Sequence, residues 1–68
     1  MVYPNLKTEM KRRCISQVML AGILRANPQT IRGKCNGYIQ WKLPEMLKIK
    51  EYLLYRGSIE DLFKKETA

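Results

Sequence analysis

Histidine is absent from the sequence, and only two of its 68 residues are cysteines. A zinc site or a disulfide framework needs more such side chains, so we expect no metal and two reduced thiols. The longest run without a charged residue, Cys14 to Leu24, is too short to span a bilayer. Because the N-terminus also lacks the pattern of a secretory signal, we expect a cytoplasmic protein with no membrane partner.

The missing residues also argue against catalysis. Without histidine the sequence lacks the commonest general base, and it has no glycine-rich phosphate loop and no residues spaced like a catalytic triad. A redox role for Cys14 is open in principle, but no histidine is available to activate its thiol. We therefore predict that the protein is not an enzyme and has no catalytic residue, no cofactor and no small-molecule substrate.

Acidic residues are missing from a long internal stretch, between Glu9 and Glu45. All of the net charge of +7 lies in that interval, because the acidic and basic residues outside it are equal in number. The basic residues of the interval are Lys11, Arg12, Arg13, Arg25, Arg32, Lys34 and Lys42. A basic surface can simply keep a protein soluble, and it can also bind phosphates. Confinement of the charge to one segment favours nucleic acid as the partner.

Few glycines and prolines and many apolar residues predict an ordered chain, and the length allows one small domain, residues 1–68. Apolar residues recur at helical spacing, so the predicted fold class is all-α. Residues that start or stop helices divide the chain into five helices, at about 5–13, 17–24, 28–35, 44–54 and 58–64. The residues expected to face inward include Leu6, Met10, Leu20, Ala21, Leu24, Ile31, Cys35, Met46, Leu47, Ile49, Leu53, Leu54, Ile59, Leu62 and Phe63.

The stretch Gln17–Gly37 predicts two short helices joined by a tight turn. Ser16 and Asn27 are expected to cap the starts of these helices, and Asn36-Gly37 to stop the second. This is the arrangement of a helix-turn-helix, whose second helix enters the major groove of DNA. The residues expected on the outside of the second helix are Gln29, Thr30, Arg32, Gly33 and Lys34.

Two single residues leave alternatives open. Cys14 is expected at the end of the first helix, where a non-glycine residue either takes another cap geometry or carries strain of about 1 kcal/mol. Trp41 follows the helix pair and either covers the edge of the core or, if exposed, binds a partner together with Tyr38.

Several short segments mark most of the chain in order: Ile15-Ser16-Gln17, Leu20-Ala21, Thr30-Ile31, Asn36-Gly37, and then 43–49 and 58–63. Together they resemble the phage repressor and Cro-like helix-turn-helix regulators, also called the xenobiotic-response-element family. The resemblance implies a five-helix, lambda-repressor-like DNA-binding domain. The sequence departs from the family pattern at Cys14 and Arg25, where members very often carry glycine, and at Pro28, which lacks a hydrogen-bonding side chain.

The resemblance also implies which side chains meet DNA. By that resemblance, the base-facing residues are Asn27, Pro28, Gln29 and Gly33, and the phosphate-contacting residues are Gln17 and Asn36. Side-chain chemistry matches Gln29 to adenine and adds Arg32, which can bind guanine or a phosphate. The other expected phosphate contacts are Thr30, Lys34, Tyr38 and Lys42, and the methyl group of Thr30 could instead meet thymine.

These patterns predict a sequence-specific, double-stranded DNA-binding transcriptional regulator of the phage or prophage repressor or Cro-like type, acting in the cytoplasm of a bacterial host cell. We expect a homodimer, at least on an operator, because one small module offers limited contact area. The expected dimer face is formed by the fourth and fifth helices with Tyr52, Tyr55 and Phe63. The alternative is a protein-interaction module of the same fold, an antitoxin or an inhibitor of a phage or host protein, which an exposed Trp41–Tyr38 patch would favour.

Overall fold

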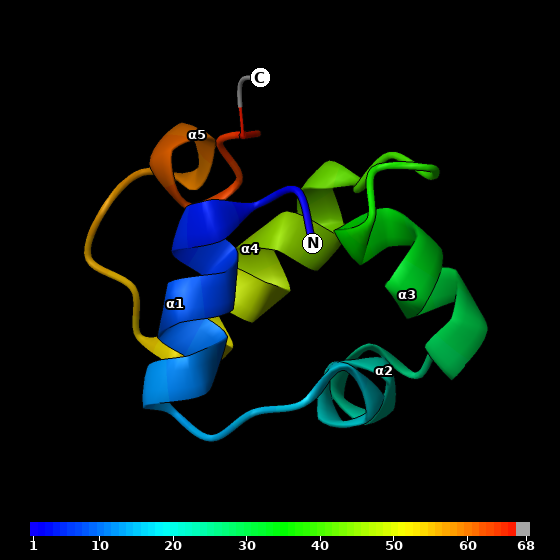
Figure 1. Cartoon of the computed structure of the whole chain (residues 1–68). Coiled ribbons are helices and arrows are strands. Elements are labelled where there is room, and N and C mark those ends of the chain that lie inside the picture. The colour runs from blue at the N-terminus through cyan, green and yellow to red at the C-terminus, as the bar shows by residue number, and fades with distance from the viewer. Residues whose placement is uncertain (67–68) are drawn as a thin grey trace.

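In the computed structural model, five helices and no strand form within the described residues, 1–66 (Figure 1). The helices are α1 (Pro4–Arg12), α2 (Gln17–Leu24), α3 (Pro28–Cys35), α4 (Leu43–Leu53) and α5 (Ile59–Leu62). The predicted all-α, five-helix fold class is therefore confirmed. The last two residues of the predicted domain, 67–68, lie outside the described part of the chain.

Side-chain caps start α2, α3 and α5, the first two at the residues that the sequence predicted. The amide of Met19 donates to Ser16 Oγ at 3.2 Å, and the amide of Gln29 donates to Asn27 Oδ1 at 2.8 Å. At α5 the amide of Asp61 donates to Ser58 Oγ at 3.0 Å. Each bond satisfies one of the backbone donors that a helix leaves free at its N-terminus, and so fixes the residue at which the helix begins.

The fifth helix is shorter than predicted, because it begins after Ser58 and ends at Leu62 rather than Lys64. Phe63 leaves the helical conformation, with ψ at 23°, and packs its ring edge-on against two other aromatic rings. The ring centroids lie 5.9 Å from Tyr3 and 5.5 Å from Trp41. Aromatic packing of this kind holds the end of α5 onto the core.

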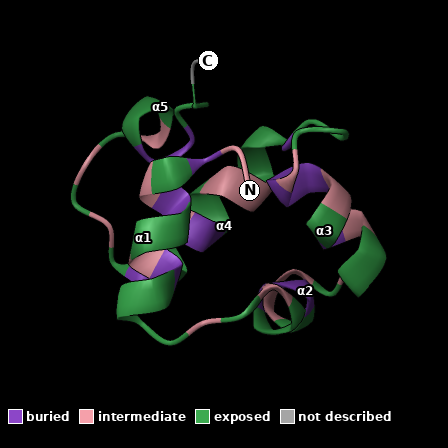
Figure 2. Ribbon diagram, in the orientation of Figure 1, coloured by how far each residue is buried: buried purple, intermediate pink, exposed green. Residues whose placement is uncertain are grey.

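The core draws at least one fully buried side chain from each helix (Figure 2). The largest of them are Leu6, Leu20, Ile31, Cys35, Ile49, Leu53 and Leu62. Burial raises the pKa of Cys35 to about 11, so its thiol stays protonated and acts as a small apolar side chain. Trp41 is only 7% exposed and covers the edge of this core, so the alternative of an exposed Trp41 is wrong.

Two leucines of the expected inward face are not in the core. Leu47 and Leu54 are 49% and 69% exposed, whereas Ile49 and Leu53 on the same helix are fully buried. Leu24, Met46 and Ile59 are only partly buried, at the margin of the core. Helical periodicity places apolar residues on a face but does not say how wide the buried part of that face is.

Among residues 1–66, three non-glycine residues adopt the left-handed conformation, each at or beyond the end of a helix. Cys14 has φ of 54°, Arg25 has φ of 53°, and Leu54 has φ of 53°. Of the two alternatives open at Cys14, the structure has the strained, left-handed one. Each of these turns lets the backbone amide of the following residue donate a hydrogen bond to the preceding helix. The amide of Ile15 donates to the Met10 carbonyl at 2.8 Å, and the amide of Ala26 donates to the Ala21 carbonyl at 2.9 Å.

Replacing Cys14 with glycine is expected to stabilise the protein by about 0.5–1 kcal/mol, because glycine adopts positive φ without a steric cost. Cys14 is exposed, so its side chain contributes little packing that could be lost. Urea unfolding followed by circular dichroism measures the change, and Cys14→Ala is the matched control that retains Cβ. If Cys14→Gly were no more stable than Cys14→Ala, the claim of backbone strain at position 14 would be contradicted.

Both ends of the described chain meet beside the end of α3. The amide of Val2 donates to the Cys35 carbonyl at 3.0 Å, and the amide of Glu66 donates to the Val2 carbonyl at 2.7 Å. Tyr3 is buried next to them. These contacts hold the C-terminal end of α3 in place, although the helix is too short and polar to be stable alone.

Candidate nucleic-acid interface

The pair α2 and α3 forms the helix-turn-helix unit on which the candidate site is built. Three residues, Arg25, Ala26 and Asn27, separate the two helices. The left-handed Arg25 reverses the chain, and Asn27 together with Pro28 starts α3. Since α2 packs mainly against α3, the turn and the core together fix the orientation of the second helix.

One hollow of about 510 Å³ lies between the start of α2 and the outer side of α3. Its lining residues are Gln17, Val18, Pro28, Gln29, Arg32 and Asn36. Five of these six are residues that the sequence predicted to meet DNA, and the sixth, Val18, was not foreseen. Val18 is 66% exposed, so it gives the hollow an apolar wall. An exposed valine beside polar residues carries no distinct signal in the sequence.

Gln29 and Arg32 provide most of the hydrogen-bonding capacity of the hollow. Both are exposed and lie three residues apart on α3, so they share one face of the helix. Ile31, between them, is fully buried and anchors that face from behind. In residues 1–66 Arg32 has no ion-pair partner, so its guanidinium is available to an external acceptor.

Asn27 has a structural task in addition to its exposed position. Its side-chain oxygen accepts the amide hydrogen of Gln29 at 2.8 Å and is thereby engaged in starting α3. A base contact by Asn27 would therefore use its amide nitrogen, unless the cap were given up. Pro28 is exposed at the first position of α3 and adds only apolar contact area.

Gly33 faces Ile39 rather than the hollow. Its carbonyl accepts the amides of Tyr38 and Ile39 at 2.9 and 3.3 Å. A Cβ atom on Gly33 would lie 2.9 Å from Ile39 Cδ1, which is closer than such atoms pack. Gly33 therefore packs against Ile39 and is not among the residues that line the hollow.

Lys34 is buried, and the expectation that it lies on the outside of α3 is wrong. Its ammonium group donates to both oxygens of Glu45, at 2.6 and 2.5 Å, and lies 5.6 Å from the centre of the Trp41 ring. Lys34 follows the buried Ile31 by three residues, so it belongs to the inward side of the helix. We therefore remove Lys34 from the candidate phosphate contacts.

The contact with Lys34 helps to lower the pKa of Glu45. Burial by itself raises the pKa of Glu45, but hydrogen bonds from Lys34 and from the Lys42 amide, with the charges of both residues, outweigh it and lower the pKa overall. The hydrogen bond from the Lys42 amide to Glu45 Oε1, 3.0 Å long, also caps the start of α4. Glu45 thus joins α3 to α4 and neutralises one of the basic charges near the site.

The remaining predicted phosphate contacts lie outside the hollow. Thr30 is partly buried on α3, while Tyr38, which is 85% exposed, and the exposed Lys42 lie in the segment between α3 and α4. Figure 1 shows this segment as a loop beyond the end of α3. Tyr38 and Lys42 are therefore accessible beside the helix, but the structure does not gather them with Gln29 and Arg32.

Positive charge remains on the acid-free interval between Glu9 and Glu45 after its ion pairs are counted. Arg12 pairs with Glu9 at 2.9 Å, and Lys34 pairs with Glu45. Within the described chain the other basic residues of the acid-free interval have no ion-pair partner; they are Lys11, Arg13, Arg25, Arg32 and Lys42. The charge pattern that favours nucleic acid thus persists in the folded protein.

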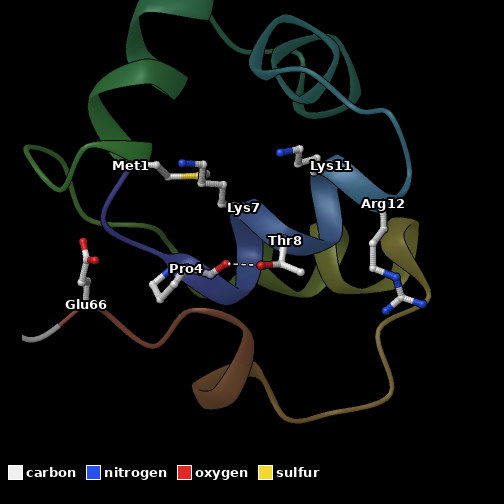
Figure 3. Close-up of a pocket in the computed structure, with 7 residues that line it drawn as sticks. All are labelled: Met1, Pro4, Lys7, Thr8, Lys11, Arg12 and Glu66. Atoms are coloured by element: carbon white, nitrogen blue, oxygen red, sulfur yellow. Dashed lines mark hydrogen bonds between the residues drawn. The ribbon is translucent and has the colours of Figure 1, made fainter.

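A second basic hollow, of about 530 Å³, lies along α1 (Figure 3). Lys7 and Lys11 extend from the helix with their amines on the same side, and Glu66 lies at the other end. Thr8 turns its hydroxyl back to the Pro4 carbonyl at 2.9 Å and is not free to bind there. None of the predicted DNA contacts lines this hollow.

Neither a membrane span nor a metal cluster is found in the part of the chain that the structure describes. No helix of residues 1–66 has the length and apolar character needed to cross a bilayer. The same residues contain no group of three or more histidine, cysteine, aspartate or glutamate side chains placed to hold a metal ion.

Comparison with known protein families finds no matching family model, and no curated protein is significantly similar to the chain. The class is therefore defined by the structure itself. It is a small all-α domain of five helices in which α2 and α3 present polar residues around one hollow.

Proposed function

We propose that the protein is a sequence-specific, double-stranded DNA-binding transcriptional regulator of the phage or prophage repressor or Cro-like type. The observation that carries the proposal is the hollow that gathers Gln17, Gln29, Arg32 and Asn36 on the exposed side of α3. In the proposal α3 enters the major groove and the protein acts by occupying an operator in a bacterial host cell.

The proposed contacts divide between bases and backbone. Gln29 binds adenine through two atoms, and Arg32 binds guanine or a phosphate. Gln17 and Asn36, which also line the hollow, bind phosphates and set the position of α3 in the groove. With Gly33 and Lys34 turned to other contacts, few side chains remain to read bases, so DNA shape contributes to recognition.

The alternative of a protein-interaction module has lost the feature that would favour it. An exposed patch of Trp41 and Tyr38 was the expected signature, and Trp41 is buried. Tyr38 is exposed, but without Trp41 the expected patch does not form. DNA therefore remains the partner that the polar hollow and the unpaired basic residues fit best.

Fluorescence anisotropy of a labelled duplex, titrated with protein at several salt concentrations, tests the proposal. We expect binding that weakens steeply as salt rises, because phosphate contacts release counterions from DNA. Selection from a pool of random duplexes then identifies the operator. A folded protein that binds no duplex at low salt would overturn the proposed function.

Arg32→Ala and Gln29→Ala are each expected to weaken binding to the selected operator about fivefold to tenfold, which corresponds to roughly 1–1.4 kcal/mol. Both side chains are exposed, so the melting temperature should stay unchanged. Lys48→Ala is the control for Arg32→Ala, because it removes one positive charge from an exposed site outside the hollow. If Arg32→Ala and Lys48→Ala weakened operator binding equally, the effect of Arg32→Ala would come from net charge alone.

A further inference from the structure

Three arginines line a small hollow between the end of α1 and the loop that joins α4 to α5. Arg12 and Arg13 come from the last residue of α1 and the residue after it, and Arg56 comes from the loop. The hollow has a volume of about 270 Å³, and we call it the arginine hollow after these three residues. Figure 1 shows α1 and this loop on the side of the domain away from α3, and no residue of the arginine hollow lines the candidate DNA interface.

The loop that presents Arg56 is fixed by contacts on either side of it. Before Arg56, the amide of Tyr55 donates to the Lys50 carbonyl at 3.1 Å, and the hydroxyl of Tyr55 donates to the Asp61 carboxylate. After Arg56, Gly57 lies so close to the Tyr55 ring that an added Cβ atom would be 2.6 Å from Tyr55 Cε2. The loop backbone therefore holds Arg56 beside the end of α1 without the help of a ligand.

On the opposite wall of the hollow, Glu9 orients Arg12. Nη1 of Arg12 donates to Glu9 Oε1 at 2.9 Å, and the Glu9 side chain is only 12% exposed. A guanidinium group carries five N–H donors, and the 68% exposure of the Arg12 side chain leaves most of them accessible. Figure 3 shows Arg12 extending away from Lys7 and Lys11, so it is not grouped with the two lysines of α1.

The arginine hollow has an excess of positive charge. Of the described residues, Glu9 is the only acidic one that lines it, and Glu9 pairs with Arg12. Arg13 and Arg56 have no ion-pair partner in residues 1–66. The dipole of α1 favours basic residues at its C-terminal end, but it does not account for Arg56, which belongs to another segment. Two unpaired guanidinium groups in one concave site repel each other, and an anion bound between them would remove this repulsion.

The residue type at the three positions also points to an anion. The chain contains eight lysines and five arginines, yet three of the five arginines line this hollow and no lysine does. Lysine would serve equally well to keep a surface soluble. A guanidinium group presents its donors as a planar fork that matches two oxygens of a phosphate at once, which an ammonium group cannot do.

We infer that the arginine hollow binds a dianionic phosphate group, as carried by inorganic phosphate or a small phosphate monoester. The unpaired charges of Arg13 and Arg56 match the charge of about −1.5 to −2 on such a group, whereas each backbone phosphate of DNA carries a single charge. Size points the same way, because pockets for larger organic ligands have volumes of about 300–1,000 Å³ and this hollow has about 270 Å³. The inference does not depend on the proposed function.

A nuclear magnetic resonance titration of the isotope-labelled chain tests the inference. Inorganic phosphate is added at constant ionic strength, with sodium chloride as the reference. We expect saturable shifts of the amides of Arg13, Arg56 and Gly57 and of the arginine Nε–H signals, with no such shifts in sodium chloride alone. Dimethyl phosphate, a monoanion with the diester chemistry of the DNA backbone, should bind about fivefold more weakly, because it carries half the charge.

Substitution of Arg56 separates the guanidinium fork from net charge. Arg56→Gln should weaken phosphate binding about tenfold with an unchanged melting temperature, because the side chain is exposed and supplies charge-assisted hydrogen bonds. Arg56→Lys retains the charge without the fork and should weaken binding about threefold. Arg25→Gln is the matched control, because Arg25 is also exposed and unpaired in residues 1–66 but does not line the hollow, and it should bind phosphate like the wild type.

Several results would overturn the inference. They are the absence of saturable shifts at the arginine hollow, and phosphate binding by Arg56→Gln equal to that of the wild type. Equal binding of dimethyl phosphate would make the site a contact for a nucleic-acid backbone, and binding of tetraglutamate without binding of phosphate would make it a contact for an acidic protein segment. Shifts centred on Gln29 and Arg32 would place phosphate at the candidate DNA interface instead.

The titration contains no duplex, so its failure would leave the proposed function standing. A protein that binds phosphate at the arginine hollow but binds no duplex at low salt would overturn the proposed function alone.

Discussion

Ile31→Ala should lower the free energy of unfolding by about 2–5 kcal/mol, the range for removing most of a buried aliphatic side chain. Ile31 is fully buried at the centre of α3, where it joins the outer helix of the α2–α3 pair to the core. A domain of this size has only several kcal/mol of stability in total, so much of the folded population would be lost.

Urea unfolding followed by circular dichroism measures the effect of Ile31→Ala. Ile31→Val is the matched control, because it removes a single methyl group and should cost only about 0.5–1.5 kcal/mol. An unfolding curve for Ile31→Ala that overlays that of the wild type would remove Ile31 from the core.

Substitutions of the neighbouring residues Ile31 and Arg32 should therefore impair DNA binding in two different ways. Loss of Ile31 should abolish DNA binding by unfolding the protein, and low temperature or a stabilising variant such as Cys14→Gly should restore it. Loss of Arg32 should weaken DNA binding in a protein of normal stability. Since the two residues are adjacent, this contrast tests the orientation of α3 directly.

Local signals in the sequence predicted the helix pair well. Ser16 and Asn27 cap α2 and α3, and Ile31 and Cys35 are buried, as their positions indicated. The end of the first helix near Cys14 was also predicted, although the sequence left open whether Cys14 would be left-handed. In each case the conformation depends mainly on neighbours within one helical turn, so the chain order contains the necessary information.

The departures arise where a distant residue decides the outcome. Lys34 is buried because Glu45 and Trp41, seven or more positions further on, meet it across the boundary of α3 and α4. Gly33 is covered by Ile39, which the tight return of the chain brings back onto the helix. Helical spacing places Lys34 on the same side as Ile31, but its charge predicted a solvated side chain, since the sequence contains no information about these partners.

The exposed side of α4 shows the same limit. Leu47 and Leu54 have the spacing of core residues, and their exposure depends on how much of α4 the other helices cover. Five short helices cover only part of it. Apolar spacing thus shows which residues can face a core, but not where the core ends.

Lys34→Met should lower the free energy of unfolding at neutral pH by about 1.5–3 kcal/mol, the range for a hydrogen bond to a charged group. Methionine retains an apolar chain that can pack near Trp41, so the change mainly removes the charge. Glu45, whose side chain is 22% exposed, then loses its main partner and keeps the amide of Lys42. Partial exposure of the carboxylate keeps the loss below that of a fully buried pair.

The loss of unfolding free energy in Lys34→Met should depend on pH. The pair lowers the pKa of Glu45 below its ordinary value of 4.5, so its contribution is fully present above that value. It disappears as the pH falls through the lowered pKa, because the carboxyl group becomes protonated. The stability difference between wild type and Lys34→Met should therefore be largest at neutral pH and shrink in acid, as urea unfolding at a series of pH values would show.

Glu45→Gln combined with Lys34→Met completes the test. The glutamine can still accept the Lys42 amide, so the double variant should be less destabilised than the two single variants together predict. Lys48→Met, an exposed lysine on the same protein, should change stability little.

The same variants decide whether Lys34 meets DNA: with its ammonium group held by Glu45, Lys34→Met should bind duplex DNA normally at temperatures where it is folded. If it instead kept full stability and bound DNA with a shallower salt dependence, Lys34 would be a phosphate contact after all, and its pairing with Glu45 would not describe the protein in solution.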